Sequence, residues 1–146
     1  MQRVTRATVS VGGHEVSHIA AGLMCLVGIA HDDTTDDVKW LAAKLVQMRI
    51  FDDENGVMNK SVLQVDGEIM LVSQFTLHAS TRKGNRPSYI AAARPEHARP
   101  LYDEICDEVQ HLSGKPVARG SFGDHMAIDM VNDGPVTIII DSRQRE

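Results

Sequence analysis

Two uninterrupted apolar runs place the strongest constraint on how this chain folds. Leu23 to Ala30 contains no polar side chain, and Ile69 to Val72 is apolar at every position. Neither run alternates with polar residues, so each is typical of a strand covered on both faces. The fold must therefore place other layers on each side of these strands. Counted from Gly22, the first run is nine residues long, far short of the roughly twenty needed to cross a bilayer. We therefore expect no membrane association.

Size and composition indicate one ordinary globular domain spanning residues 1–146. The chain has 16.1 kDa, with 42% hydrophobic and 24% charged residues, so bulk disorder is excluded. Cys25 and Cys106 each lie in an apolar stretch, which indicates neither a disulfide scaffold nor a zinc site and fits a reducing compartment. Met1–Val11 has no apolar signal region, so we expect a soluble, cytoplasmic protein.

The first strands are predicted from alternation. Ala7, Val9 and Val11 alternate with Thr8 and Ser10, which predicts a half-buried strand over 4–11. A Gly-Gly turn then leads to a short second strand over 15–19. Two further hairpins are expected from turn residues between apolar segments: 62–65 with 68–77 around Asp66-Gly67, and 126–131 with 136–140 around Asn132–Pro135.

Two amphipathic helices complete the pattern. After a cap at Thr34 or Thr35, apolar residues recur at helical spacing from Val38 to Arg49, which predicts a helix of about fourteen residues. A second helix is expected over 95–112; Pro100 implies that it either starts late or kinks. The order of elements predicts an α/β fold, a layered β/β/α domain of mixed sheets with two helices on one side.

Several common chemistries lack their sequence signatures. The chain has no Walker A, GxGxxG or GxSxG motif. His31 with Asp32 and Asp33, and Asp124 with His125 and Asp129, resemble metal clusters but lack the spacing of metal sites. We interpret them as solvated residues and expect no metal and no cofactor.

Two segments remain unexplained by ordinary packing. Ser73-Gln74-Phe75-Thr76-Leu77 ends a buried apolar strand, where hydrogen-bonding side chains are costly unless satisfied or functional. Alternation along that strand would place Gln74 and Thr76 on one face. Asn132-Asp133-Gly134-Pro135 has the composition of a turn, but Gly-Pro also permits a cis bond, and glycine permits close approach of the backbone to a ligand.

These segments, together with others in the same order, resemble the D-aminoacyl-tRNA deacylase family nearly from end to end. The matching motifs are Gln2-Arg3-Val4, Arg49-Ile50-Phe51, Gly56-Val57-Met58-Asn59, Ser73-Gln74-Phe75-Thr76-Leu77, Gly84-Asn85-Arg86-Pro87-Ser88 and Val131-Asn132-Asp133-Gly134-Pro135-Val136-Thr137. Each motif alone is weak, but their joint order is specific.

The resemblance implies a homodimeric esterase that removes D-amino acids from mischarged tRNA. It implies that Ser73, Gln74, Phe75 and Thr76 form the catalytic pocket for the terminal adenosine and aminoacyl group. Gly134-Pro135 would be a Gly-cisPro motif inserted into the pocket of the other subunit, with Arg3 as its support. L-Amino acids would be rejected by the carbonyl groups of this motif. Activity on glycyl-tRNA(Ala) is expected, because glycine has no side chain to reject.

The chemistry of ester hydrolysis leaves two mechanisms open. Thr76 is a candidate nucleophile, but a threonine hydroxyl needs an adjacent base, and His78 is at most a distant candidate. The alternative uses backbone N–H groups near Phe75 and Thr76 as an oxyanion hole. The 2′-hydroxyl of the terminal adenosine would then help to activate water, which the family resemblance favours.

The net charge of −5 gives no bulk attraction to nucleic acid, and we expect no DNA partner. Arg82, Lys83 and Arg86 form a local basic cluster that is suited to the phosphates of an acceptor end, with Arg3 and Arg6 as possible neighbours. Two rival hypotheses remain: a general ester or peptide hydrolase that uses Thr76, and a non-catalytic dimeric module in which the Gly-Pro segment is only a contact.

Overall fold

A long, bent first strand organises the whole sheet. The computed structural model describes residues 1–145, and in it β1 (Gln2–Val11) pairs antiparallel with three strands. These are β2 (His14–Ile19), β3 (Gly22–Val27) and, on its other edge, β8 (Ala127–Thr137). Gly12 and Gly13 both have positive φ, 57° and 81°, as the expected tight turn requires. The strands over 4–11 and 15–19 and this turn are therefore confirmed.

The two apolar runs lie side by side in the middle of the sheet. β3 pairs in parallel with β6 (Glu68–Ser73), which in turn pairs in parallel with the short β7 (Ala118–Arg119). The backbones approach closely at Gly22, where an added Cβ would lie 1.9 Å from the carbonyl oxygen of Glu68. Leu23 and Leu71 have no exposed surface, so the expectation of two strands covered on both faces is confirmed, although β3 ends at Val27 and not at Ala30.

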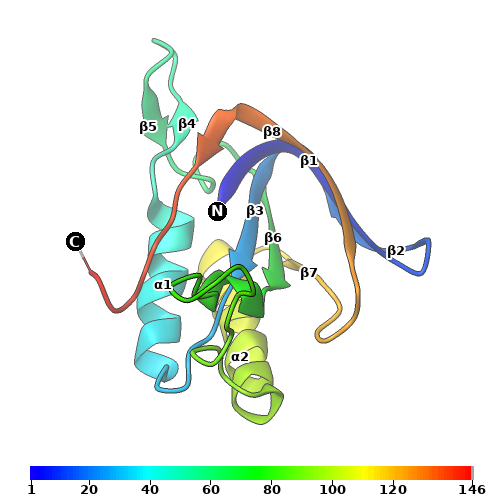
Figure 1. Ribbon diagram of the computed structural model, residues 1–146. Helices are drawn as coiled ribbons and strands as arrows, with labels where there is room; N and C mark the ends of the chain where they lie inside the picture. The colour runs from blue at the N-terminus through cyan, green and yellow to red at the C-terminus, as the bar shows by residue number, and fades with distance from the viewer. Residues whose placement is uncertain (146) are drawn as a thin grey trace.

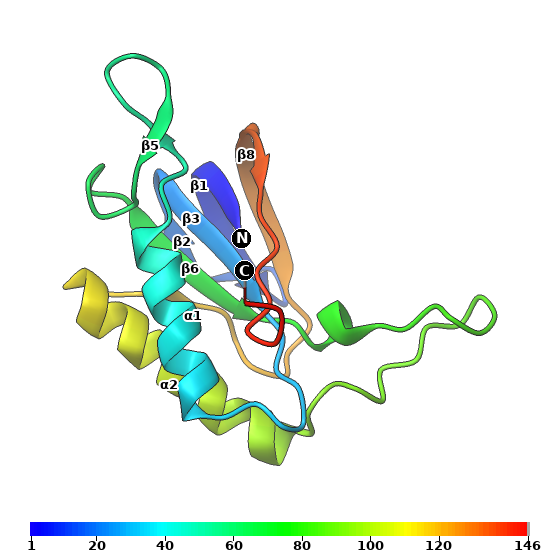
Figure 2. The same cartoon turned by 90° about the vertical axis from the view of Figure 1, so that its left-hand side faces the viewer.

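The layers follow from the curvature of this sheet (Figure 1). β1, β2 and β8 fold over one face of β3 and β6, and apolar side chains fill the space between them: Val4, Ala7, Val9, Ile19, Met24, Met70 and Val72. Both helices cover the opposite face, as Figure 2 shows from the side. The predicted β/β/α arrangement, with mixed strands and two helices on one side, is confirmed.

The helices begin where the sequence predicts. α1 (Thr35–Gln47) is preceded by the N-cap Thr34, whose backbone N–H donates to the Asp37 carboxylate in a capping box. α2 (Pro95–Ser113) begins at Pro95 and continues through Pro100, so the late start is wrong. Pro100 has no N–H, so the Glu96 carbonyl lacks its helical hydrogen bond. Both residues are exposed, so water can bind that oxygen instead.

The hairpin predicted over 62–77 is wrong. Residues 62–66 form turns, closed by a 2.9 Å hydrogen bond from Gly67 N–H to the Val62 carbonyl. The turn residues therefore lead the chain into β6, which lies beside β3. The segment before the turn forms no strand that pairs with β6. The local hairpin lies earlier, between β4 (Phe51–Asp52) and β5 (Met58–Lys60). β6 also ends at Ser73, and residues 75–78 form a 3-10 turn, η1 (Phe75–His78).

The closing hairpin is wrong as well. β8 runs without reversal from Ala127 to Thr137 along β1. Its register jumps, because Val4 faces Asn132 while Gln2 faces Thr137, so residues 133–136 bulge opposite Arg3. The same residue types occur in bulges and in hairpin turns. In this chain, pairing with the long strand β1 makes the segment a bulge. Within residues 1–145, no helix is long and apolar enough to cross a membrane.

Candidate functional site

A cavity of about 570 Å³ opens where β3 and β6 end. Its walls come from these strand ends, the start of η1, the segment leading into α2 and the loop that follows β7. The lining residues are Val27, Ile29, Val72, Ser73, Gln74, Phe75, Tyr89, Ala92, Ala93, Arg94, Pro95, Ala98, Phe122, Gly123, Asp124, His125, Met126 and Ile128. Apolar walls with a few polar groups are typical of small-molecule sites.

Three of the four residues predicted to form the pocket line this cavity. Ser73, Gln74 and Phe75 do so, whereas Thr76 does not. The Gln74 amide donates a hydrogen bond to the Thr76 hydroxyl, so these side chains meet through the 3-10 turn and not through strand alternation. The Phe75 ring is 57% exposed and packs edge-on against Tyr89, with ring centroids 5.2 Å apart.

Within residues 1–145, no base is hydrogen-bonded to the Thr76 hydroxyl. Its hydrogen-bond partner is an amide, which does not accept a proton at neutral pH. His78, the candidate considered from the sequence, has its Nε2 atom buried without a partner in the described chain. That atom would lie 3.1 Å from a Cβ placed on Gly28, so the ring packs against the backbone directly after β3.

Sequence reasoning missed the far wall of the cavity. Tyr89 and Arg94 precede α2, and Phe122, Asp124 and His125 lie between β7 and β8. Only weak local signals mark these residues, such as an aromatic ring between Gly120 and Gly123. Their convergence on β6 depends on contacts between distant segments, which no local pattern contains.

The Gly134-Pro135 segment lies outside the cavity of its own chain. The peptide bond is cis, as expected, and both residues are exposed. Arg3 contacts the bulge in β8: its guanidinium is 3.0 Å from the Asp133 carboxylate and 3.2 Å from that of Asp52. It also donates a 2.9 Å hydrogen bond to the Ile50 carbonyl. Among the described residues, Arg3 is the only charged one that is buried.

The predicted basic cluster lies on a projecting loop, visible at the right of Figure 2. Ser80 and Ser88 close the loop through paired backbone hydrogen bonds of 2.8 and 2.9 Å. Arg82, Lys83 and Arg86 are exposed, and none forms an ion pair within the described chain. Arg3 and Arg6, in contrast, form ion pairs with Asp133 and Asp129 of β8.

Neither cysteine is suited to nucleophilic chemistry. Both thiols are buried, and burial raises the pKa of Cys25 to about 12 and that of Cys106 to about 11. Thiols with such pKa values stay protonated at neutral pH. Over residues 1–145, no three His, Cys, Asp or Glu side chains are grouped so that they could hold a metal ion.

Comparison with known proteins gives consistent matches over the full chain. Residues 1–141 match the family model described as D-Tyr-tRNA(Tyr) deacylase. A protein of Parabacteroides distasonis named D-aminoacyl-tRNA deacylase is 58% identical over 145 residues, covering 99% of this chain and 97% of the relative. A Bacteroides fragilis protein of the same name is 54% identical over 146 residues, covering 100% and 97%.

Solved structures show the same fold. A chain named c-Myc DNA Unwinding Element Binding Protein superposes with a TM-score of 0.88 at 38% identity, covering 94% of this chain and 93% of its own. A second structure, described as a probable eukaryotic D-amino acid tRNA deacylase, superposes with a TM-score of 0.78 at 17% identity, covering 91% and 92%.

Proposed function

Because this chain belongs to the D-aminoacyl-tRNA deacylase family, and so is a hydrolase acting on aminoacyl-tRNA, we propose that the 570 Å³ cavity is its active site. The cavity would hold the terminal adenosine and the D-aminoacyl group. The observation that carries this assignment is the convergence of Ser73, Gln74 and Phe75 on one apolar cavity with exposed aromatic rings at its mouth. Aromatic side chains are the usual stacking partners of unpaired bases.

The hydrolysis step would use the backbone and the substrate. The first N–H groups of a 3-10 turn have no acceptor within that turn, and η1 begins at Phe75, directly at the cavity. Those N–H groups are placed to stabilise an oxyanion on the ester carbon. Since the ester is already activated, positioned water with help from the 2′-hydroxyl of the terminal adenosine suffices. The products are free D-amino acid and tRNA.

Chiral selection would require a second subunit. Gly134 and Pro135 are exposed and lie outside the cavity of their own chain, so they reach a substrate only in a partner molecule. Their carbonyl groups would occupy the space of an L side chain, and glycyl-tRNA(Ala) would escape this exclusion. Exposed apolar residues beside the cavity, on β8 and just after it support a homodimer: Phe75, Leu77, Tyr89, Ile90, Val131 and Ile139.

The direct test compares three substrates with the purified protein. We expect hydrolysis of D-aminoacyl-tRNA and glycyl-tRNA(Ala), no hydrolysis of the matched L-aminoacyl-tRNA, and little of a free D-amino-acid ester. Equal turnover of the free ester would favour a general ester hydrolase. Hydrolysis of no charged tRNA would leave only a dimeric interaction module. Because the proposed active site acts on translation substrates, we place the protein in the cytoplasm.

Replacing Thr76 should have a small effect. In Thr76→Ala we expect deacylation to stay within about fivefold of the unmodified rate, because the hydroxyl lies outside the cavity and has no base beside it. Single-turnover rates on D-aminoacyl-tRNA measure this, with Thr76→Ser as the matched control. A loss of several orders of magnitude with intact folding, together with a trapped acyl-enzyme, would establish the nucleophile instead.

The basic loop should contribute to RNA binding and not to the chemical step. Changing Arg82, Lys83 and Arg86 to Ala should weaken tRNA binding, and each lost phosphate contact should reduce the slope of log affinity against log salt by about 0.7. The matched control changes Lys39, Lys44 and Arg49, three exposed cations on and just after α1, to Ala. An equal change in slope for both triple variants would show that the loop residues act only as ordinary surface charges. Duplex DNA serves as the competitor that should not bind.

A further inference from the structure

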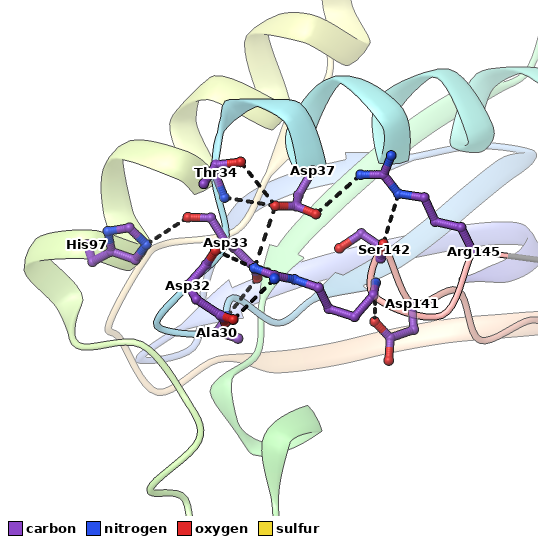
Figure 3. Close-up of polar contacts among 10 residues, drawn as sticks. Ala30, Asp32, Asp33, Thr34, Asp37, His97, Asp141, Ser142 and Arg145 are labelled. Carbon is purple, nitrogen blue, oxygen red and sulfur yellow. Dashed lines mark hydrogen bonds and ion pairs between the residues drawn. The ribbon is translucent and has the colours of Figure 1, made fainter.

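The segment after β8 folds back onto the start of α1. We call residues 141–145 the strap. Its turn is closed by hydrogen bonds from Arg143 N–H to the Asp141 carboxylate, at 2.8 Å, and from Gln144 N–H to the Asp141 carbonyl, at 3.1 Å. Figure 3 shows Asp141, Ser142 and Arg145 lying beside Asp33 and Asp37. The strap therefore connects the last strand to the first helix.

Arg143 is the cation at the centre of this contact. Its guanidinium is 3.1 Å from the Asp32 carboxylate, 3.1 Å from that of Asp33 and 3.7 Å from that of Asp37. It also donates to the Asp32 carbonyl. A single exposed ion pair contributes little, but a planar guanidinium shared among several carboxylates holds them in a defined geometry. Asp33 and Asp37 are mostly buried, with side chains 14% and 15% exposed.

Asp33, which pairs with Arg143, also contacts two other segments of the chain. Its carboxylate accepts a 2.7 Å hydrogen bond from the Ala30 N–H. Its carbonyl lies 3.0 Å from Nε2 of His97, in the first turn of α2. Figure 3 shows Asp33 between Ala30 and His97. The same residue therefore fixes the end of the apolar run after β3 and the beginning of α2.

Both segments are walls of the cavity. Ile29 lines it from one side, and Ala93 and Ala98 line it from the other. A 2.8 Å hydrogen bond from Ala93 N–H to the Ile29 carbonyl joins the two walls. A shift of Asp33 would therefore change the width of the cavity without touching β6 or η1, which carry the groups assigned to the chemistry.

We propose that Arg143 is a positioning residue for substrate binding, which acts through Asp33 to hold the two walls of the cavity at the spacing that fits the D-aminoacyl-adenosine end. This inference rests on the proposed function of the cavity. Without the cation, four aspartates within residues 32–37 would repel one another, and Asp33 would lose the partner that orients it. The hydrogen bond to the Asp33 carboxylate also raises the pKa of the Arg143 guanidinium.

The test compares Arg143→Ala and Arg143→Lys with Arg145→Ala. Arg145 is the matched control, because it belongs to the same strap and pairs with Asp37 at 3.4 Å but does not contact Asp33. In Arg143→Ala we expect KM for D-aminoacyl-tRNA to rise about tenfold with kcat within about twofold, as for a lost binding contact. Arg143→Lys should recover part of this loss, and Arg145→Ala should stay within about twofold.

A second probe separates positioning from attraction of phosphate. It is 3′-amino-3′-deoxyadenosine carrying a D-amino acid through an amide, which has no phosphate and cannot be hydrolysed. Its Kd should rise by the same factor in Arg143→Ala. Equal KM and Kd values in the Arg143→Ala and Arg145→Ala variants would overturn the inference, as would a loss confined to kcat.

Failure of the proposed function would look different. If the probe bound the unmodified protein without perturbing the NMR signals of Tyr89 and Phe122, the cavity would not be the active site. The role of Arg143 would then be judged by amide hydrogen exchange at Ala30 and Ala93. Exchange there should accelerate in Arg143→Ala and not in Arg145→Ala, and unchanged exchange would overturn the positioning role.

Discussion

A D-aminoacyl-tRNA that ends in 2′-deoxyadenosine and is charged on its 3′-hydroxyl should be hydrolysed at least about a hundredfold more slowly than the normal substrate, the usual range for losing an acid or base group. The reason is that neither Thr76 nor His78, the side chains considered for this role from the sequence, is in position to take it over. Thr76 lies outside the cavity, with an amide as its partner, and His78 packs against Gly28, directly after β3. The Ser73 and Tyr89 hydroxyls line the cavity, but a protein hydroxyl also needs an adjacent base to be activated. We therefore assign this role to the 2′-hydroxyl of the substrate, which is next to the ester.

Single-turnover hydrolysis at saturating enzyme measures this effect, because it separates chemistry from binding. The affinity of the uncharged 2′-deoxy tRNA should match that of normal tRNA, which is the control. His125, at the rim of the cavity, offers a second check, and His125→Gln should leave the rate within about threefold. An undiminished rate with the 2′-deoxy substrate would remove the 2′-hydroxyl from the mechanism and return attention to this histidine.

Mixed dimers should show that each site needs both subunits. One subunit carries Ser73→Trp, which fills the cavity; the other carries Gly134→Ala. An added Cβ at Gly134 would lie 2.7 Å from a Val136 methyl group and 2.9 Å from the Val136 nitrogen, at φ +122°, so the motif must shift. Both lesions fall in one composite site and leave the other intact. The heterodimer should retain about half of the D-selective activity, whereas each damaged homodimer should have none.

Differently tagged subunits, co-expressed and purified through both tags, give the heterodimer for this measurement. A heterodimer of unmodified and Ser73→Trp subunits is the matched control and should also show about half of the activity. Heterodimer activity near zero would place cavity and motif in the same subunit. A monomer in solution with full D-selectivity would contradict the cross-subunit arrangement altogether.

The gap between sequence and structure is clearest at the two failed hairpins. The sequence predicts hairpin turns at Asp66-Gly67 and Asn132–Pro135, and the backbone is irregular at both, with φ 55° at Asp66 and φ 122° at Gly134. In neither case did the interruption reverse the chain into an antiparallel partner. The first leads into β6, which pairs in parallel with β3, and the second is a bulge within β8.

The sequence by itself determined the local elements and the character of the core. Its periodicity placed both helices, the first three strands and the two strands covered on both faces, because side-chain burial repeats with the geometry of each element. Its motif order identified the family and predicted the cis bond at Gly134-Pro135. Of the predicted pocket residues Ser73 to Thr76, the first three line the cavity and Thr76 does not.

Only the tertiary structure decided which segments meet. The cavity needs Tyr89, Arg94 and Phe122 beside β6, and the strap needs Arg143 beside Asp33. These contacts join residues far apart in the chain, and their free energy comes from burial and charge pairing that exist only once the sheet and helices have packed. A local pattern records which face of an element is apolar, but it does not record which distant face covers it.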